Sequence, residues 1–147
     1  MVSAGQSNQQ FAEAYAQYIG TQYCIPCGNG LDALKLMLRG EMELGRLHEG
    51  DEIIVPANTY IATILAITEC RLNPILVEPR WETLQIDDRL LHQVLTPRTK
   101  AVMTVHLYGR CAMTEAIERF CQQHNLLLFE DNAQRMDACM ATERQVL

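Results

Sequence analysis

The chain has 147 residues, 48% of them hydrophobic and 20% charged, which fits one soluble globular domain. Eighteen acidic and twelve basic residues give a net charge of -6, so neither nucleic acid nor a membrane surface is an expected partner. The longest uncharged apolar stretch, 60–68, is shorter than the roughly 20 residues that span a bilayer, and the N-terminus lacks a signal-peptide pattern. These features predict a cytoplasmic protein.

Hydrophobic periodicity predicts helices and strands that alternate along the chain. The first helix is expected to run from a capping box at Ser7 and Gln10 to Gly20. Further elements are expected as a short strand 22–26, a helix 31–44, a buried strand 52–56, a helix 59–69, a buried strand 74–79, a short helix 87–95, a strand within 100–109, a helix 113–124 and a strand 126–131. Such alternation predicts a single α/β domain over 1–147, with three layers and a mostly parallel sheet flanked by helices.

Six cysteines in a chain without an export signal are expected to be reduced thiols. Cys24 and Cys27 form a CxxC pair, which can be a redox pair or half of a zinc site. No second CxxC accompanies the pair, and the four histidines are scattered. Buried structural thiols are therefore favoured, and a thiol redox domain is the weaker alternative.

Ligands of parallel sheets bind beyond the carboxyl ends of the strands, and three segments of this chain are expected there. The first is GNGLDA, at 28–33, where two glycines precede a helix. Backbone N–H groups and the helix dipole suit this turn to a phosphate, although a glycine-rich turn that only starts a helix is an equal alternative. The spacing matches neither GxGxxG nor a P-loop.

The other two segments place an aromatic ring and a carboxylate at the same edge. Tyr60, just after the strand 52–56, could stack on a planar ligand or pack in the core. Asp131 ends an apolar strand, where a carboxylate needs a cation or a capping role. The protonated ring nitrogen of pyridoxal phosphate (PLP) would supply that cation, and Gln134 could donate to the phenolic oxygen of the ring. A helix cap or an ion pair with an arginine is the alternative for Asp131.

Four segments in this order, CGNGLDAL, EGDEIIVPANTYIATILAI, TPRTKAVMTVHLYG and FEDNAQ, resemble the PLP-dependent sugar-nucleotide aminotransferases of the DegT/StrS type. The resemblance implies the large-domain fold of aspartate aminotransferase, PLP fold type I. It also implies cofactor-binding roles for Gly30, Leu31, Asp32, Tyr60, Asp131 and Gln134. Of these, Leu31 and Asp32 would bind the phosphate by their backbone N–H groups. Many members have Thr where this chain has Leu31.

The segments GNGLDAL and LVEP most resemble the subgroup that aminates a 3-keto-6-deoxyhexose attached to dTDP, with glutamate as amino donor. The resemblance therefore implies a sugar nucleotide and glutamate as substrates, a place in deoxyaminosugar or O-antigen biosynthesis, and a homo-oligomer. His106, in VHLYG, is interpreted as structural, because a neutral histidine after a buried strand needs only one hydrogen-bond partner.

A transaminase of this type holds PLP as a Schiff base on a lysine. The chain has only Lys35, one turn inside a predicted helix, and Lys100, at the amino end of a strand, and neither matches the family position. Residues 135–147 carry no resemblance. The expected molecule is a partial large domain without the lysine segment and the small C-terminal domain, inactive in transamination by itself. A non-catalytic PLP-fold remnant or association module is the alternative.

Overall fold

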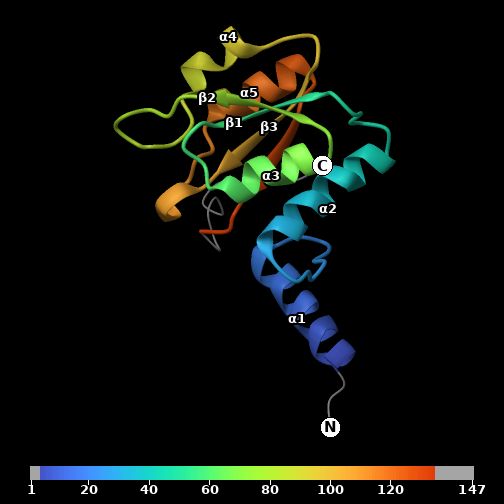
Figure 1. Ribbon diagram of the computed structural model, residues 1–147. Helices are drawn as coiled ribbons and strands as arrows, with labels where there is room; N and C mark the ends of the chain where they lie inside the picture. The colour runs from blue at the N-terminus through green and yellow to red at the C-terminus, as the bar shows by residue number, and fades with distance from the viewer. Residues whose placement is uncertain (1–3, 135–147) are drawn as a thin grey trace.

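Four parallel strands form one sheet in the order β2-β1-β3-β4 (Figure 1). The computed structural model describes residues 4–134. Its elements are α1 (Ala4–Ile19), α2 (Gly30–Glu43), β1 (Glu52–Pro56), α3 (Ile61–Glu69), β2 (Asn73–Val77), η1 (Asp88–Leu90), α4 (Leu91–Val94), β3 (Thr99–Val105), η2 (Leu107–Gly109), α5 (Glu115–His124) and β4 (Leu127–Asp131). The expected alternation and the parallel α/β sheet are confirmed.

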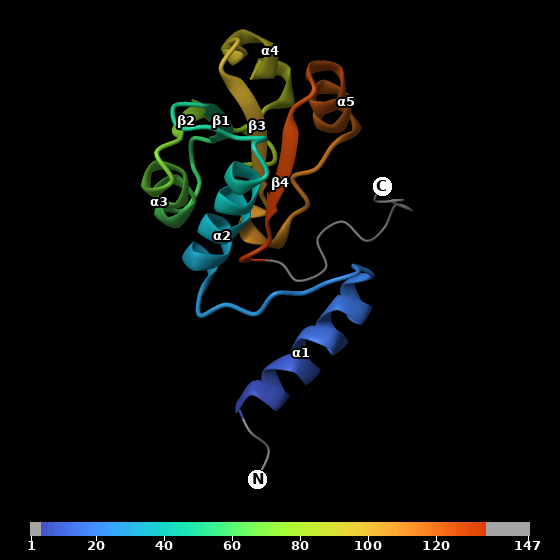
Figure 2. The same ribbon diagram turned by 90° about the vertical axis from the view of Figure 1, so that its right-hand side faces the viewer.

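Helices cover both faces of the sheet, as the apolar strands predicted (Figure 2). Successive side chains of a strand point to opposite faces, so Ile53 and Val55 pack in one core with α2 and α3, while Ile54 packs in another with α4 and α5. All five residues of β1 are buried, as expected for a central strand of a covered sheet. The three-layer arrangement is confirmed.

The register of the sheet decides which strand ends lie together. Val105 at the end of β3 pairs with Asp131 at the end of β4, and Pro56 ends β1 on the same side. The N-terminal end of α3 lies at this edge as well, because α3 follows β1. The start of α2 is there too, since Gly30 lines one cavity with Val105 and Asp131. Asn29 caps α2 by accepting the N–H of Asp32 at 2.9 Å. The ends of three strands and the starts of two helices thus converge at one edge of the sheet.

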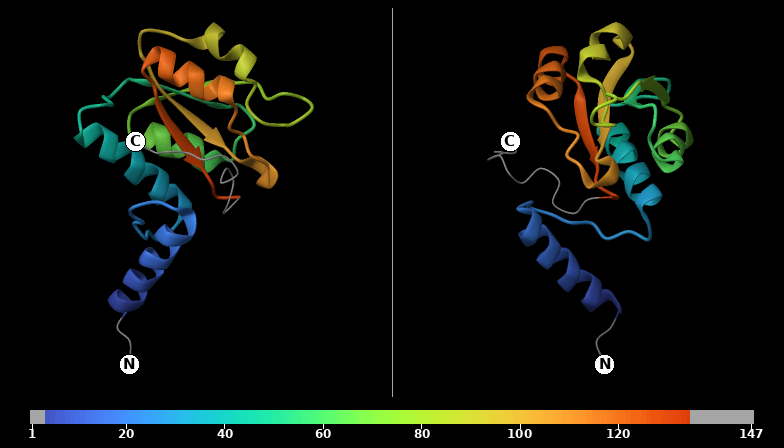
Figure 3. Two further views of the ribbon diagram at one scale, coloured as in Figure 1. Left: turned by 180° about the vertical axis from the view of Figure 1, so that it is seen from behind. Right: turned by 90° about the vertical axis from the view of Figure 1, so that its left-hand side faces the viewer.

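Helix α1 lies apart from the sheet in all views (Figures 1 and 3). Its Phe11 and Tyr15 rings stack with centroids 5.7 Å apart, but Phe11 and Tyr18 are each 58% exposed. The helix begins at Ala4, before the predicted capping box at Ser7. The apolar face of α1 is therefore only partly buried by the described residues.

Two strand predictions differ from the structure, the first entirely and the second in its burial. Residues 22–26 form no strand, and Tyr23 and Ile25 are 76% and 81% exposed. A strand needs a neighbour for its ladder of hydrogen bonds, and the described sheet places none beside this segment. The strand predicted as buried at 74–79 is the edge strand β2, with Leu76 54% exposed, which also explains why Pro74 is tolerated inside it.

The remaining differences are local. The helix expected at 87–95 is the short turn η1 followed by the four residues of α4. Cys24, Cys27, Cys70 and Cys121 are free thiols as expected, but Cys111 is disulfide-bonded, so the expectation of thiols throughout was wrong. Between residues 4 and 134, no helix has both the length and the apolarity needed to cross a membrane.

Candidate functional site

A cavity of about 580 Å³ opens at the carboxyl edge of the sheet. Its wall comes from the N-terminal ends of α2 and α3, the end of β3 and the residues that end and follow β4. Apolar side chains such as Leu34, Leu65 and Val105 form much of the surface. Five of the six predicted site residues line this cavity: Gly30, Leu31, Tyr60, Asp131 and Gln134. A mostly apolar cavity of this size with a few converging polar groups suits a small organic ligand.

Asp131 is a buried carboxylate, 8% exposed, on the wall of this cavity. One oxygen, Oδ2, accepts the hydroxyl of Thr63 at 3.0 Å, and the other, Oδ1, accepts the N–H of Ala133 at 3.1 Å. Both donors are neutral, and none of the ion pairs found between residues 4 and 134 includes Asp131. The predicted alternative, an ion pair with an arginine, is therefore not formed in the described part of the chain.

Tyr60 and Gln134 present an aromatic ring and an amide to the cavity. Tyr60 occupies the N-cap position of α3 and is 69% exposed, so the alternative that it packs in the core was wrong. The Gln134 Oε1 atom accepts the backbone N–H of Tyr108 at 2.6 Å. Because Oε1 is engaged there, the end of the amide that remains to donate is its NH₂ group.

The start of α2 is arranged differently from the prediction. The backbone N–H of Asp32 donates to Asn29 Oδ1 at 2.9 Å. The carboxylate of Asp32 accepts a hydrogen bond from Asn29 Nδ2 at 2.8 Å and forms an ion pair with Lys35 at 3.3 Å. Asp32 does not line the cavity, whereas Gly30 and Leu31 do. The capping bond uses the Asp32 donor, so the amides of Gly30 and Leu31 are the candidates for binding a ligand at this helix end.

His106 and Glu130 form a separate pair outside the lining of the cavity. Nδ1 of the fully buried His106 accepts the N–H of Ala112 at 2.9 Å, so the ring proton lies on Nε2, which is 2.9 Å from a carboxylate oxygen of Glu130. Both ring nitrogens are engaged, and neither residue lines the cavity. The structural interpretation of His106 agrees with this geometry.

Neither lysine of the sequence lines the cavity. Lys35 Nζ lies 2.9 Å from Glu69 and 3.3 Å from Asp32, and its hydrogen bonds to these carboxylates raise its pKa above 10.5. Lys100 donates to the carbonyl of Pro97, at the amino end of β3 and thus at the opposite edge of the sheet. The charged Lys35 is a poor nucleophile, and Lys100 is remote from the site.

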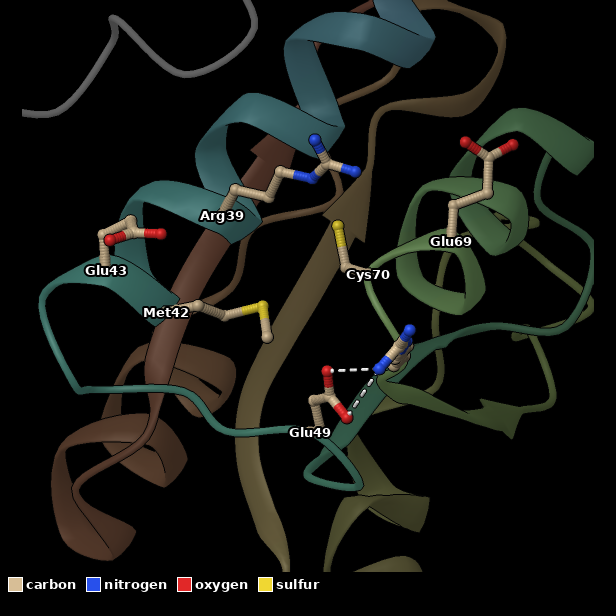
Figure 4. A pocket seen from close by; sticks show the side chains of 7 residues that line it. Arg39, Met42, Glu43, Glu49, Glu69 and Cys70 are labelled. Carbon is tan, nitrogen blue, oxygen red and sulfur yellow. Dashed lines mark hydrogen bonds and ion pairs between the residues drawn. The ribbon is translucent and has the colours of Figure 1, made fainter.

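A second, smaller hollow of about 300 Å³ lies near the C-terminal ends of α2 and α3 (Figure 4). Charged side chains surround it, and Arg71 and Glu49 form an ion pair across part of it at 3.0 Å. It contains none of the predicted site residues. Cys24 and Cys27, the CxxC pair, line neither hollow.

Thr63 and Thr59 are the site residues that the sequence analysis did not identify. Thr63 is fully buried and donates to Asp131, and its oxygen lies 2.9 Å from that of Thr59. The available signal was a hydroxyl side chain in the first turn of a largely apolar helix, one turn after another threonine. A buried hydroxyl at such a position needs a polar partner.

Comparison with known proteins decides the family. The model of the DegT/DnrJ/EryC1/StrS aminotransferase family matches residues 1–146. The chain belongs to this family. It is 47% identical over 124 residues to dTDP-3-amino-3,6-dideoxy-alpha-D-galactopyranose transaminase of Aneurinibacillus thermoaerophilus, covering 84% of this chain and 33% of that protein. It is 41% identical to GDP-perosamine synthase of Caulobacter vibrioides, covering 92% and 36%.

Solved structures of similar proteins confirm the fold. DesV of Streptomyces venezuelae, in complex with a ketimine intermediate, superposes with a TM-score of 0.82 at 39% identity, covering 88% of this chain and 34% of that one. NtdA of Bacillus subtilis, with bound cofactor PMP, gives a TM-score of 0.86 at 31% identity, covering 95% and 31%. The chain thus has the fold of PLP-dependent aminotransferases, and it spans about a third of the length of the relatives it matches.

Proposed function

We propose that this chain binds pyridoxal phosphate and forms the cofactor-binding part of a sugar-nucleotide aminotransferase. The observation that carries the proposal is Asp131, a buried carboxylate that lines a cavity and receives hydrogen bonds only from neutral donors among residues 4–134. Desolvation of a carboxylate is costly unless a cation offsets it. A protonated ring nitrogen in the cavity would supply that cation.

The other cavity residues fit the remaining parts of the same cofactor. The N-terminal end of α2, with the amides of Gly30 and Leu31, fits the phosphate. The exposed ring of Tyr60 fits the face of the pyridine ring, and the NH₂ group of Gln134 fits its phenolic oxygen. When bound, PLP supplies an electron sink for cleavage of a bond at the substrate Cα atom.

The described residues would bind and orient the cofactor rather than carry out amino transfer. Asp131 would hold the proton on the ring nitrogen, and the apolar wall at Leu65 and Val105 would limit the access of water. The amine that carries PLP in a transaminase is not supplied at this cavity, because Lys35 and Lys100 both lie outside its lining. We therefore expect reversible, non-covalent binding by these 147 residues.

For the substrate, we propose a dTDP-linked 3-keto-6-deoxyhexose, with glutamate as donor. The relative at 47% identity is named as a dTDP-3-amino-3,6-dideoxyhexose transaminase, while others act by name on GDP- or UDP-linked sugars. Equilibrium dialysis in the presence of pyridoxamine phosphate, with dTDP-, GDP- and UDP-linked 6-deoxyhexoses, should show a preference for dTDP. Equal binding of all three would contradict the substrate and leave the cofactor proposal standing.

We also propose that the chain self-associates in the cytoplasm, as expected from the family resemblance. The apolar side chains that α1 leaves exposed and the edge strands β2 and β4 support this proposal. Sedimentation should show a dimer or larger species at micromolar concentration. A stable monomer would contradict the proposal.

The decisive experiment measures cofactor affinity. The purified chain should bind pyridoxal phosphate and pyridoxamine phosphate saturably in equilibrium dialysis. Asp131→Asn should weaken both by about thirtyfold or more, because it removes one partner of a largely desolvated, hydrogen-bonded charge pair. Glu130→Gln is the matched control, since this neighbouring carboxylate contacts His106 and lies outside the cavity lining. Absence of saturable binding by the unchanged chain, or equal effects of the two variants, would contradict the proposal.

A further inference from the structure

We propose that Thr63, supported by Thr59, is a positioning residue that fixes the carboxylate of Asp131 for the ring nitrogen of the cofactor. This inference rests on the proposed function and adds a role that the sequence analysis did not assign. Thr63 lies in the first turn of α3, is fully buried, and has its hydroxyl oxygen 3.0 Å from Asp131 Oδ2 and 2.9 Å from Thr59 Oγ1.

The chemistry of the three groups gives these hydrogen bonds a direction. An ionised carboxylate can only accept hydrogen bonds, so the single hydroxyl proton of Thr63 points to Asp131. The bond between the two threonines must then run from the hydroxyl of Thr59 to the oxygen of Thr63. Donation by Thr59 polarises the Thr63 hydroxyl and strengthens its bond to the carboxylate.

The arrangement leaves the carboxylate oriented but still able to accept. Thr63 and the N–H of Ala133 each use one lone pair of a different oxygen, so rotation of the carboxylate would break both bonds. Each oxygen keeps a further lone pair, and Asp131 lines the cavity. A cationic N–H in the cavity therefore meets an acceptor whose direction is already set, which lowers the cost of ordering it on binding.

The same bonds connect two parts of the site that are distant in sequence. Thr59 precedes Tyr60 directly, and Thr63 follows it by one helical turn. The two hydroxyls thus tie the loop that carries the stacking ring to the end of β4, which carries the carboxylate. The ring face and the ring nitrogen of one planar ligand would be recognised by groups held in a common geometry.

The test uses two ligands, pyridoxamine phosphate and its analogue with a carbon in place of the ring nitrogen. Thr63→Val has the shape of threonine without the hydroxyl, and Thr63→Ser keeps the hydroxyl. Thr68→Val is the matched control, because Thr68 lies in the same helix and donates only to backbone carbonyls of that helix. Affinities are measured by equilibrium dialysis, and thermal midpoints report whether each variant folds.

We expect Thr63→Val to weaken pyridoxamine phosphate about tenfold and the analogue by less than about twofold, since only the former has a ring N–H for Asp131. Thr63→Ser should restore most of the affinity, and Thr68→Val should leave both ligands unchanged. Equal weakening of both ligands by Thr63→Val would show a general packing role and overturn the inference. So would unchanged affinity for pyridoxamine phosphate.

Two further outcomes keep the inference distinct from the proposed function. If the unchanged chain binds neither ligand, the proposed function fails first. If Thr63→Val does not fold, Thr59→Val takes its place, because Thr59 is only partly buried and its loss leaves the bond between Thr63 and Asp131 intact. Thr59→Val should weaken pyridoxamine phosphate about threefold and spare the analogue. An equal effect on both ligands, or none, would overturn the inference.

Discussion

Two buried carboxylates at opposite edges of the sheet differ in how their charge is satisfied. Glu52, at the amino end of β1, is 2% exposed and pairs with Arg98 at 2.7 Å, with further hydrogen bonds from Thr96 and Thr99. Asp131, at the carboxyl end of β4, also receives a threonine hydroxyl, but no cation among the described residues pairs with it.

This difference in pairing distinguishes Glu52, a structural carboxylate, from Asp131, a carboxylate suited to binding a ligand. The hydrogen bond from Thr96 is the largest cause of the lowered pKa of Glu52, and the Arg98 charge adds to it, so this site is complete within the chain. Asp131 borders a cavity instead. A buried acid without an internal cation, placed on a cavity wall, is the arrangement that an external cation completes.

The largest stability effect should come from Glu52. Glu52→Gln should lower the free energy of unfolding by about 1–3 kcal/mol, because it breaks a buried charge pair and weakens two hydroxyl bonds. Urea denaturation measures the change. Glu49→Gln is the control, since the pair of Glu49 with Arg71 is exposed and should contribute less than about 1 kcal/mol. Equal effects of the two variants would remove the distinction between a buried and an exposed pair.

Low pH should destabilise the fold, because it protonates the carboxylates of Asp87 and Glu52, which pair with arginines in the folded chain. The hydrogen bond and charge of Arg89 lower the pKa of Asp87 from 3.8 to about 2, and the pKa of Glu52 lies below its ordinary 4.5. The unfolded chain therefore takes up protons first, so the stabilisation is full above about pH 4.5 and is lost as the pH falls towards 2. Asp87→Asn should make the fall in melting temperature over this range shallower. An unchanged slope would contradict the assignment.

At the other edge, Leu31→Thr should raise the affinity for pyridoxal phosphate about threefold. Leu31 is half-buried at the start of α2 and lines the cavity, and a hydroxyl there would add one donor to the phosphate. Equilibrium dialysis measures the gain, with Leu36→Thr, an exposed position of the same helix, as control. Unchanged or weaker binding would show that the phosphate does not lie at this helix end.

Asp131→Asn should change stability little, in contrast to Glu52→Gln. The free energy of unfolding should stay within about 0.5 kcal/mol or rise, because the variant removes a buried charge that no cation of the described segment pairs with, and it keeps a carbonyl for one of its donors. Thermal and urea unfolding in the absence of cofactor measure this. A loss as large as that of Glu52→Gln would mean that Asp131 is mainly structural.

Substitution of the two lysines should have the smallest effect on the affinity for pyridoxal phosphate. Borohydride treatment after addition of pyridoxal phosphate should leave no specific covalent label, and Lys35→Met and Lys100→Met should keep the affinity of the unchanged chain. The reason is that Lys35 is held charged by two carboxylates and Lys100 lies at the opposite edge of the sheet. Mass spectrometry of tryptic peptides locates any label. A stoichiometric label on either lysine would contradict non-covalent binding.

The sequence by itself determined the α/β class, the alternation of strands and helices that implies a parallel sheet, and the family. Apolar runs of strand length alternate with helical patterns of apolar residues. These signals can be read from the sequence because each depends only on residues that lie close together along the chain. Five of the six expected site residues line one cavity because strand ends and helix starts are readable from sequence, and parallel strands bring them to one edge.

Only the tertiary structure decided which strands pair and which polar groups contact one another. Residues 22–26 have the composition of a strand but no neighbour to pair with, and Asp32 has its N–H taken by the cap of Asn29. Thr63 and Asp131 are 68 positions apart, so no local pattern could show their hydrogen bond. Whether a buried acid has a cation depends on contacts across the sheet, which is why Glu52 and Asp131 could be told apart only once the chain was folded.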